Sequence, residues 1–209
     1  MEQQITVEVE GGPRLDARLG LVDPMRGGLV LCHPHPLYGG DMDNPVVIRA
    51  AEVAREVGLA TLRFNFRGVG ASEGTHDKGR GEQDDVRAAL ASLRTRVERG
   101  PLGLAGYSFG AWVSSRVAVP GAGLVALGLI APPLSMFDGF ESLDPTGLRL
   151  LVAAGTRDPY CPLPDLDRLA ATLPDGAVAR IDGADHFFFG KLFALGEAVR
   201  RWATEWAAA

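Results

Sequence analysis

The stretch Leu-Gly-Leu-Ala-Gly-Tyr-Ser-Phe-Gly-Ala at residues 102–111 decides the fold. It begins as a short apolar strand, and a helix is expected from 108 to 119. Gly106 and Gly110 flank Ser108 in a G-x-S-x-G pattern, at positions where side chains would collide across a sharp turn from strand to helix. Such a turn exposes the serine hydroxyl at a helix amino terminus, which favours developing negative charge. The stretch predicts a nucleophilic serine, and the alternative is a glycine-bracketed turn with an idle serine.

Strands alternating with helices surround this turn. Residues 5–9 and 15–19 alternate apolar with polar side chains and predict an opening hairpin. Apolar runs predict further strands, and helical spacing of apolar residues predicts helices. This order indicates an α/β fold with one domain over residues 1–209, in which a mostly parallel eight-stranded sheet has helices on both faces. The further strands are expected at 28–32, 60–64, 102–106, 124–130, 149–154 and 178–181, and the helices at 46–57, 82–99, 108–119, 166–172 and 191–206.

A nucleophilic serine needs a base to take its proton, and that base must reach the same edge of the sheet. Among four histidines, only His186 follows a late strand, so it is the predicted base; the alternative is a histidine in a surface loop. Asp158 follows the strand at 149–154 and is expected to accept the Nδ1–H of this histidine. Asp138 and Asp144 are the alternatives for the acid. The order serine, acid, histidine along the chain is typical of one hydrolase architecture.

At these residues the sequence resembles the α/β-hydrolase superfamily over nearly the whole chain. The resemblance includes the turn at 106–110, a Gly-x-x-Asp segment at 155–158 and an Asp-His pair at 185–186. The segments 33–40 and 65–74 look more specifically like small bacterial serine hydrolases related to dienelactone-hydrolase-like proteins. The resemblance implies a cofactor-free serine hydrolase that acts on an ester-like bond. True dienelactone hydrolases have a cysteine nucleophile, so their substrate is not carried over to this chain.

The resemblance also implies two backbone donors for an oxyanion. The N–H of Phe109, which follows the nucleophile, is the first expected donor. The second falls in the loop at 33–40, where two prolines have no N–H to give. The donor is therefore expected from His35, Leu37 or Tyr38, and the match of His-Pro-His to a His-Gly-x pattern favours His35.

Composition and charge exclude several function classes. The net charge is −5, and the basic residues lie in ones and twos, so no basic stripe for nucleic acid is present. The uncharged stretch at 117–137 contains prolines and glycines that would break a spanning helix, so no membrane span is expected. The amino terminus has no apolar run of a secretory signal. Cys32 and Cys161 form neither a disulfide framework nor a Cys-x-x-Cys motif, which favours packing roles and a cytoplasmic protein.

No metal is expected. His33, His35, Asp41 and Asp43 are close in sequence and could suggest a metal site. The prolines between the histidines, together with the oxyanion role expected of this loop, argue against that alternative.

The gap between the strands at 124–130 and 149–154 bears on the substrate. Only residues 131–147 lie there, which is too short for a cap domain, so an open site for a small-molecule ester is expected. We interpret the sequence as a carboxylesterase-like hydrolase of short-chain or small esters. The alternatives are a thioesterase or small peptidase with the same triad, and a catalytically silent hydrolase-fold binding protein. The candidates for an apolar substrate surface are Tyr38, Met136, Phe137, Phe140, Tyr160 and Phe187.

Overall fold

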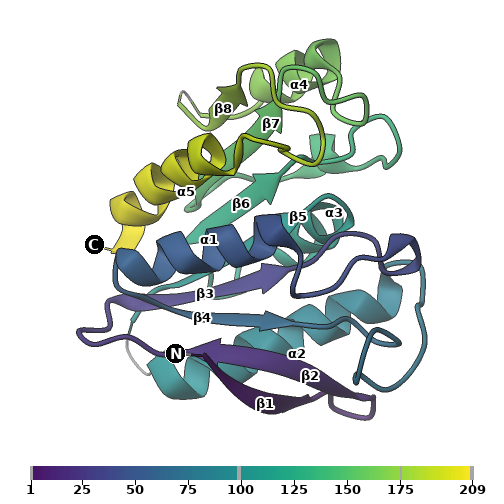
Figure 1. Cartoon of the computed structure of the whole chain (residues 1–209), viewed down its shortest axis with the longest axis vertical. Coiled ribbons are helices and arrows are strands. Elements are labelled where there is room, and N and C mark those ends of the chain that lie inside the picture. Colours follow the sequence, from purple (N-terminus) through teal and green to yellow (C-terminus); the bar gives the residue numbers. More distant parts are fainter. Residues whose placement is uncertain (1, 98–99, 175, 208–209) are drawn as a thin grey trace.

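An eight-stranded sheet runs through the centre of the molecule (Figure 1). The structure is a computed structural model that describes residues 2–97, 100–174 and 176–207. In these residues the strand order is β1-β2-β4-β3-β5-β6-β7-β8. The strands are β1 (Glu2–Glu8), β2 (Arg14–Gly20), β3 (Gly27–Cys32), β4 (Leu59–Phe64), β5 (Leu102–Tyr107), β6 (Ala126–Ile130), β7 (Arg149–Gly155) and β8 (Val178–Ile181).

The sheet is antiparallel at one edge and parallel elsewhere. Strand β2 pairs antiparallel with both β1 and β4, and every other neighbouring pair is parallel. All residues of β3, β4, β5 and β6 are buried, as continuous apolar runs in a sheet covered on both faces require. The predicted hairpin and the predicted mostly parallel eight-stranded sheet are confirmed.

Helices cover both faces of the sheet, and each face has its own apolar core. In Figure 1, α1 and α5 lie in front of the sheet and pack against each other, while α2 and α3 lie behind it. The predicted helix at 82–99 begins two residues earlier, and its predicted end at Arg99 lies outside the described residues. The helices are α1 (Pro45–Glu56), α2 (Arg80–Val97), α3 (Phe109–Val117), α4 (Leu163–Ala170) and α5 (Leu192–Ala207).

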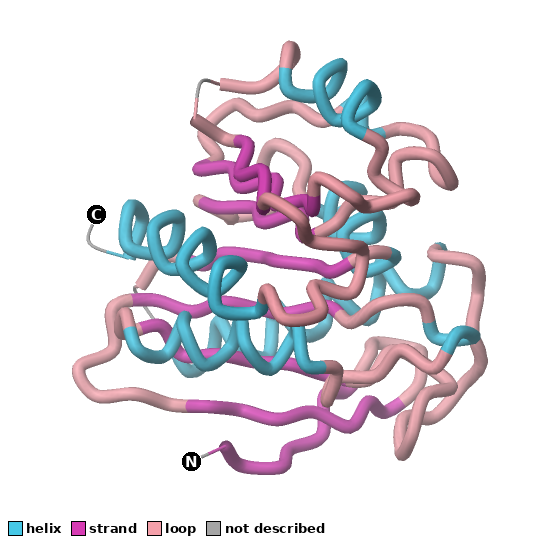
Figure 2. Tube along the Cα trace, turned by 45° about the horizontal axis from the view of Figure 1, so that its top comes forward, coloured by secondary structure: helices cyan, strands magenta, loops and turns pink. Residues whose placement is uncertain are grey.

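The chain reverses its direction of progress across the sheet at β3. Helix α1 connects β3 to β4 on one side, and α2 then carries the chain from β4 to β5 on the other side of β3. The loops that leave the carboxyl ends of β3 and β5 therefore diverge, and ligands bind in the crevice at such a switch point. The arrowheads of β3 and β4 point to the right in Figure 1, and many of the loops gather at the right-hand edge in Figure 2.

The segment between β6 and β7 is a loop. Within residues 131–148 the only regular element is a single 3-10 turn at Phe140–Ser142, so no cap domain covers the sheet edge here. None of the described helices is both long enough and apolar enough to cross a membrane.

Candidate active site

Ser108 lies alone between β5 and α3, in a backbone conformation that side chains rarely adopt. Its φ is 55° and its ψ is −117°. A Cβ atom at Gly106 would lie 2.2 Å from the carbonyl oxygen of Gly110, and one at Gly110 would lie 2.5 Å from the carbonyl oxygen of Cys32. Both flanking positions therefore require glycine, because the turn leaves no room for a side chain. The chain turns sharply here, as the sequence predicts.

Three side chains from three loops meet at the carboxyl edge of the sheet. The Ser108 Oγ lies 3.0 Å from the Nε2 of His186, and the Nδ1 of His186 lies 2.8 Å from the Oδ2 of Asp158. With its proton on Nδ1, the imidazole donates to the carboxylate and presents Nε2 as an acceptor for the serine hydroxyl. The structure thus brings together the predicted nucleophile, base and acid in the order that proton transfer requires.

The Asp158 carboxylate is buried, and both of its oxygens are hydrogen-bonded. While Oδ2 accepts from the imidazole, Oδ1 accepts the backbone N–H groups of Tyr160, at 2.8 Å, and Cys161, at 3.1 Å. These donors fix the orientation of the carboxylate. The alternatives lie elsewhere: the Asp138 carbonyl accepts from α3 side chains, and the Asp144 side chain accepts the N–H of Thr146.

Tyr107 supports the loop that carries His186, a role that was not predicted from the sequence. Its hydroxyl donates to the backbone carbonyl of His186 at 3.0 Å, and its ring lies 5.6 Å from the imidazole. Burial raises the pKa of the phenol well above its usual range, so the hydroxyl stays a donor. Its position immediately before the nucleophile, on the last residue of a buried strand, was the available signal.

The backbone N–H groups of Phe109 and His35, two residues that line a cavity with Ser108, have no acceptor within the described residues. The neighbouring candidates in the loop at 33–40 are engaged. The N–H of Leu37 donates to the Nδ1 of His35 at 3.2 Å, and the N–H of Tyr38 donates to the carbonyl of His35 at 3.1 Å. Of the three predicted second donors, only His35 keeps an N–H that is free to bind an oxyanion.

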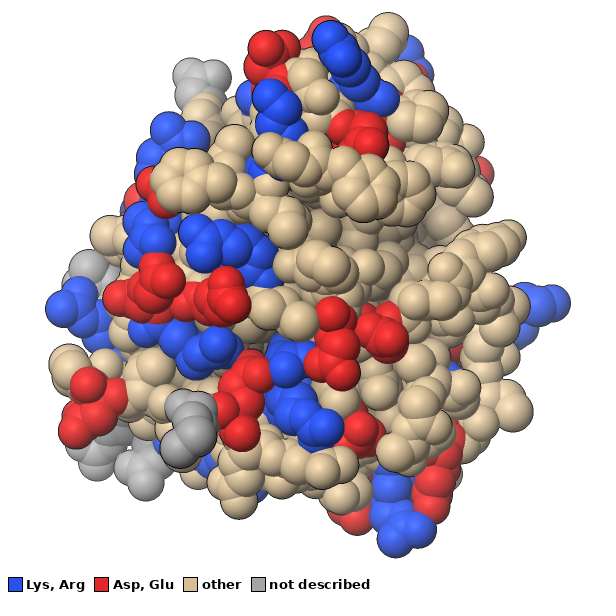
Figure 3. All heavy atoms as spheres, viewed as in Figure 1, with Lys and Arg blue, Asp and Glu red and all other residues tan. Residues whose placement is uncertain are grey.

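A cavity of about 340 Å³ opens beside Ser108 and His186. No Asp, Glu, Lys or Arg is among the residues that line it. Exposed fractions of 81% for Tyr38 and 54% for Phe187 show that its mouth is open to solvent. Figure 3 shows the face of the molecule on which α1 and α5 lie. Charged side chains gather over the left part of that face, whereas its right part is mostly uncharged. Five of the six residues predicted for the substrate surface line the cavity: Tyr38, Met136, Phe137, Tyr160 and Phe187.

One sequence expectation for this cavity is wrong. Phe140 does not line it, because its side chain is buried in the core on the α2 and α3 face of the sheet. The 3-10 turn that begins at this residue directs the ring inward. The residues that line the cavity but were not predicted are Pro34, Gly39, Gly40, Asn44, Tyr107 and Pro133.

Neither a metal centre nor a reactive thiol is present among the described residues. No group of three or more His, Cys, Asp or Glu side chains there could hold a metal ion. Cys32 and Cys161 are free and buried, and burial raises the pKa of each thiol to about 12. Both cysteines therefore stay protonated near neutral pH and act as packing residues.

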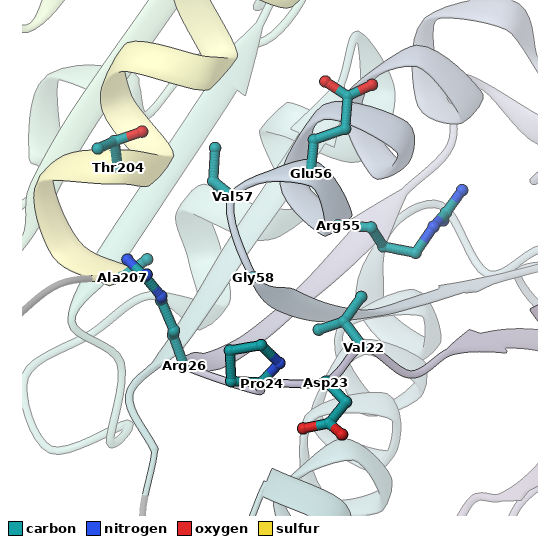
Figure 4. A pocket seen from close by; sticks show the side chains of 10 residues that line it. All are labelled: Val22, Asp23, Pro24, Arg26, Arg55, Glu56, Val57, Gly58, Thr204 and Ala207. Atoms are coloured by element: carbon teal, nitrogen blue, oxygen red, sulfur yellow. The ribbon is translucent and has the colours of Figure 1, made fainter.

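A second cavity, of about 320 Å³, lies at the opposite edge of the sheet (Figure 4). It borders the residues that precede β3 and β4 and the last turns of α1 and α5. Asp23, Arg26, Arg55 and Glu56 are its charged residues, and Arg55 is already paired with Glu2. No serine, cysteine or histidine lines this cavity, so it lacks the serine–histidine pair that the first cavity contains.

Comparisons with known proteins agree with this geometry. No protein-family model matches the chain. The chain is similar to XC6422 from Xanthomonas campestris, described as an α/β serine hydrolase without lid. The identity is 34%, over 100% of this chain and 96% of that chain, with a TM-score of 0.89. An α/β serine hydrolase homologue from Coxiella burnetii shares 34% identity over 95% of this chain and 96% of that chain, with a TM-score of 0.87.

A curated relative shows similarity at the level of sequence. The uncharacterized protein RP471 from Rickettsia prowazekii (strain Madrid E) is 33% identical over 179 residues, which are 81% of this chain and 75% of that protein.

Proposed function

The chain belongs to the α/β-hydrolase superfamily, as one of its small members without a lid, and we propose that it is a serine esterase for short-chain or small carboxylic esters. One observation carries the proposal: the hydrogen-bonded series from Ser108 through His186 to Asp158, with heavy-atom distances of 3.0 and 2.8 Å. A serine hydroxyl is a weak nucleophile unless an oriented base accepts its proton, and this series supplies that base.

Acylation begins with attack of the Ser108 Oγ on the ester carbonyl carbon while the Nε2 of His186 takes the hydroxyl proton. The carbonyl π electrons move to its oxygen, and the N–H groups of Phe109 and His35 bind that oxyanion. Collapse of the tetrahedral intermediate breaks the bond to the alkoxy oxygen. The imidazolium gives its proton to the departing alcohol, and the acyl group stays on the serine oxygen.

Deacylation repeats these steps with water as the nucleophile. The Nε2 of His186 takes a proton from water, the hydroxide adds to the acyl carbon, and the same two N–H groups bind the oxyanion. The serine oxygen then leaves and recovers its proton from the imidazolium. Asp158 accepts the Nδ1–H throughout and stabilises the imidazolium by its negative charge.

The cavity supports a small, uncharged substrate. Its volume is about 340 Å³, and its lining combines aromatic and aliphatic side chains without a basic residue that would pair with phosphate groups. This composition favours simple esters over coenzyme A thioesters and over charged peptides. The alternatives with the same triad, a thioesterase or a small peptidase, have no such observation in their favour. We also propose that residues 1–209 form a single domain and that the protein is cytoplasmic, which two free cysteines support.

A fluorophosphonate probe tests the proposal directly, because its reaction needs an activated serine. We expect labelling of the wild-type protein at Ser108 and none of Ser108→Ala. A panel of matched butyrate esters, thioesters and amides then identifies the bond that is cleaved, and the esters are expected to give the highest kcat/KM. Absence of both labelling and turnover in a folded protein would favour the catalytically silent binding protein instead.

A further inference from the structure

His33 is a fully buried polar residue that the proposed chemistry does not use. It follows β3 directly and is the first residue of the loop at 33–40. Its Nδ1 lies 2.6 Å from the carbonyl oxygen of Pro34, and its Nε2 lies 3.0 Å from the backbone nitrogen of Phe66. The ring thus connects the start of this loop to the segment that follows β4.

These two contacts determine where the imidazole proton lies. The N–H of Phe66 can only donate, so the Nε2 of His33 is the acceptor and carries no hydrogen. The proton is therefore on Nδ1, which donates to the carbonyl of Pro34. Burial lowers the pKa of His33 to about 4, so the ring keeps this single proton at neutral pH.

The Pro34 carbonyl belongs to the same rigid unit as the N–H of His35. The bond between them is trans, since the only cis peptide in the described residues precedes Pro24. In a planar trans peptide the C=O and the N–H point in opposite directions, so a group that holds one end also fixes the direction of the other. The carbonyl is confined from a second side as well, because a Cβ atom at Gly40 would lie 2.2 Å from its oxygen.

We propose that His33 is a positioning residue that directs the His35 N–H toward the oxyanion by holding the carbonyl of Pro34. This role rests on the proposed esterase function. Two other N–H groups of the loop hold the carbonyl of His35: those of Tyr38 and Gly40 both donate to it at 3.1 Å. The hydrogen bond from His33 also polarises the peptide unit, which makes the His35 N–H a stronger donor.

Two substitutions separate the two hydrogen bonds of the ring. In His33→Asn, the side-chain amide nitrogen takes the place of Nδ1 and keeps a donor for the Pro34 carbonyl, while the acceptor for Phe66 is lost. In His33→Gln, the amide oxygen takes the place of Nε2 and keeps the acceptor for Phe66, while the donor for Pro34 is lost. Each variant retains one of the two bonds, so the pair is matched for the loss of a buried hydrogen bond.

We expect His33→Gln to lower kcat for a butyrate ester by about tenfold or more at unchanged KM, because misdirecting an oxyanion donor affects only the transition state. Phenylboronic acid forms a tetrahedral adduct with a serine, and its inhibition constant should rise by the same factor. His33→Asn should stay within about threefold of the wild type in both measurements. Thermal unfolding of both variants reports their stability separately.

Equal losses of kcat in the two variants, or no loss in His33→Gln, would overturn the proposal. If neither variant folds, ¹⁵N NMR of the histidine side chains in the wild-type protein decides, because an Nε2–H tautomer of His33 contradicts the proposed hydrogen bond. Failure of the esterase function gives a different result: the wild type itself neither hydrolyses esters nor binds phenylboronic acid. The tautomer then still tests whether His33 holds the carbonyl.

Discussion

A Cβ atom on Gly155 would lie 2.3 Å from the carbonyl oxygen of Ala184. Gly155 is the last residue of β7, three residues before Asp158, and Ala184 precedes His186 by two residues. The N–H of Arg157 donates to the same carbonyl at 2.9 Å. The loop of the acid and the loop of the base therefore touch through a residue without a side chain, which sets how closely the two functional groups approach.

Gly155→Ala should separate these two loops. We expect kcat on a butyrate ester to fall by about tenfold or more, and the free energy of unfolding to fall by about 1–3 kcal/mol, because the added methyl meets backbone that cannot easily move. Gly121→Ala is the control. Gly121 has a φ of +87°, and no atom lies within 4 Å of the added Cβ, so this substitution should lower the free energy of unfolding by about 1 kcal/mol without a change in kcat. Urea unfolding and initial rates measure both quantities. Wild-type kcat in Gly155→Ala would contradict the role of this contact.

Tyr107→Phe should lower activity without removing any group that touches the scissile bond. The substitution deletes the donor to the His186 carbonyl and leaves that buried acceptor unpaired, at a cost of about 1–3 kcal/mol in unfolding free energy. With its carbonyl released, the histidine loop orients the imidazole less well, and we expect kcat to fall several-fold. Steady-state kinetics well below the unfolding temperature of the variant separate the two effects. An unchanged kcat would show that the ring alone positions the loop.

The strained backbone at Ser108 predicts that two inactive variants of this residue differ in stability. Both Ser108→Ala and Ser108→Gly should abolish probe labelling and ester turnover. Glycine adopts a φ of 55° far more readily than alanine, so Ser108→Gly should unfold with a free energy about 1 kcal/mol higher than Ser108→Ala. Urea denaturation compares the two, and Ser92→Ala, on α2, controls for the loss of a serine hydroxyl. Equal stability of the two variants would argue against strain at this residue.

Buried His33 makes stability depend on pH. Its pKa is about 4 in the folded protein against an ordinary value of 6.5, so between these pH values the unfolded chain binds more protons. The contribution is fully present above about pH 6.5 and is lost as the pH falls toward 4, by about 3 kcal/mol in all. His33→Asn has no such group, so the stability difference between wild type and variant should shrink by that amount from pH 7 to pH 4. A difference that is constant with pH would contradict a neutral His33.

The acyl-chain profile tests the shape of the cavity. A space of about 340 Å³ with an open mouth fits short acyl groups and offers no tunnel for long chains. On a series of 4-nitrophenyl esters we expect kcat/KM to be highest for acyl groups of about two to six carbons. Phe137, which packs 4.7 Å from the ring of Trp112, forms part of the wall, and Phe137→Ala should shift the optimum to longer chains. A preference for chains of twelve or more carbons in the wild type would contradict the predicted profile.

Local signals in the sequence predicted most of the fold and the three side chains that meet at the carboxyl edge of the sheet. The two glycines around Ser108 are needed for close backbone contacts within and beside one turn, so their spacing was informative. Asp158 and His186 could be placed because each follows a strand whose position in a parallel sheet determines which edge its loop reaches. The family resemblance supplied the expectation of a second oxyanion donor, which the residues alone did not.

The predictions that failed depend on how loops pack. The path of residues 131–148 determines whether Phe140 points into the cavity or into the core, and no periodic pattern encodes that path. Helix α4 begins at Leu163, before the predicted start at 166, because prolines at 162 and 164 are tolerated at a helix amino terminus. The contact of His33 with a carbonyl one residue away also leaves no mark in the sequence, since only the folded loop shows which ring nitrogen faces it.

The short loop between β6 and β7 has a kinetic consequence. Because no cap lies over the cavity in the part of the chain that the structure describes, we expect no segment to move aside before an ester enters or an acid leaves. Turnover should then be insensitive to solvent viscosity, and detergent micelles or oil droplets should give no burst of activation. An acyl group on the serine stays in contact with bulk water for its whole lifetime, so the protein should be a far better catalyst of cleavage than of ester synthesis.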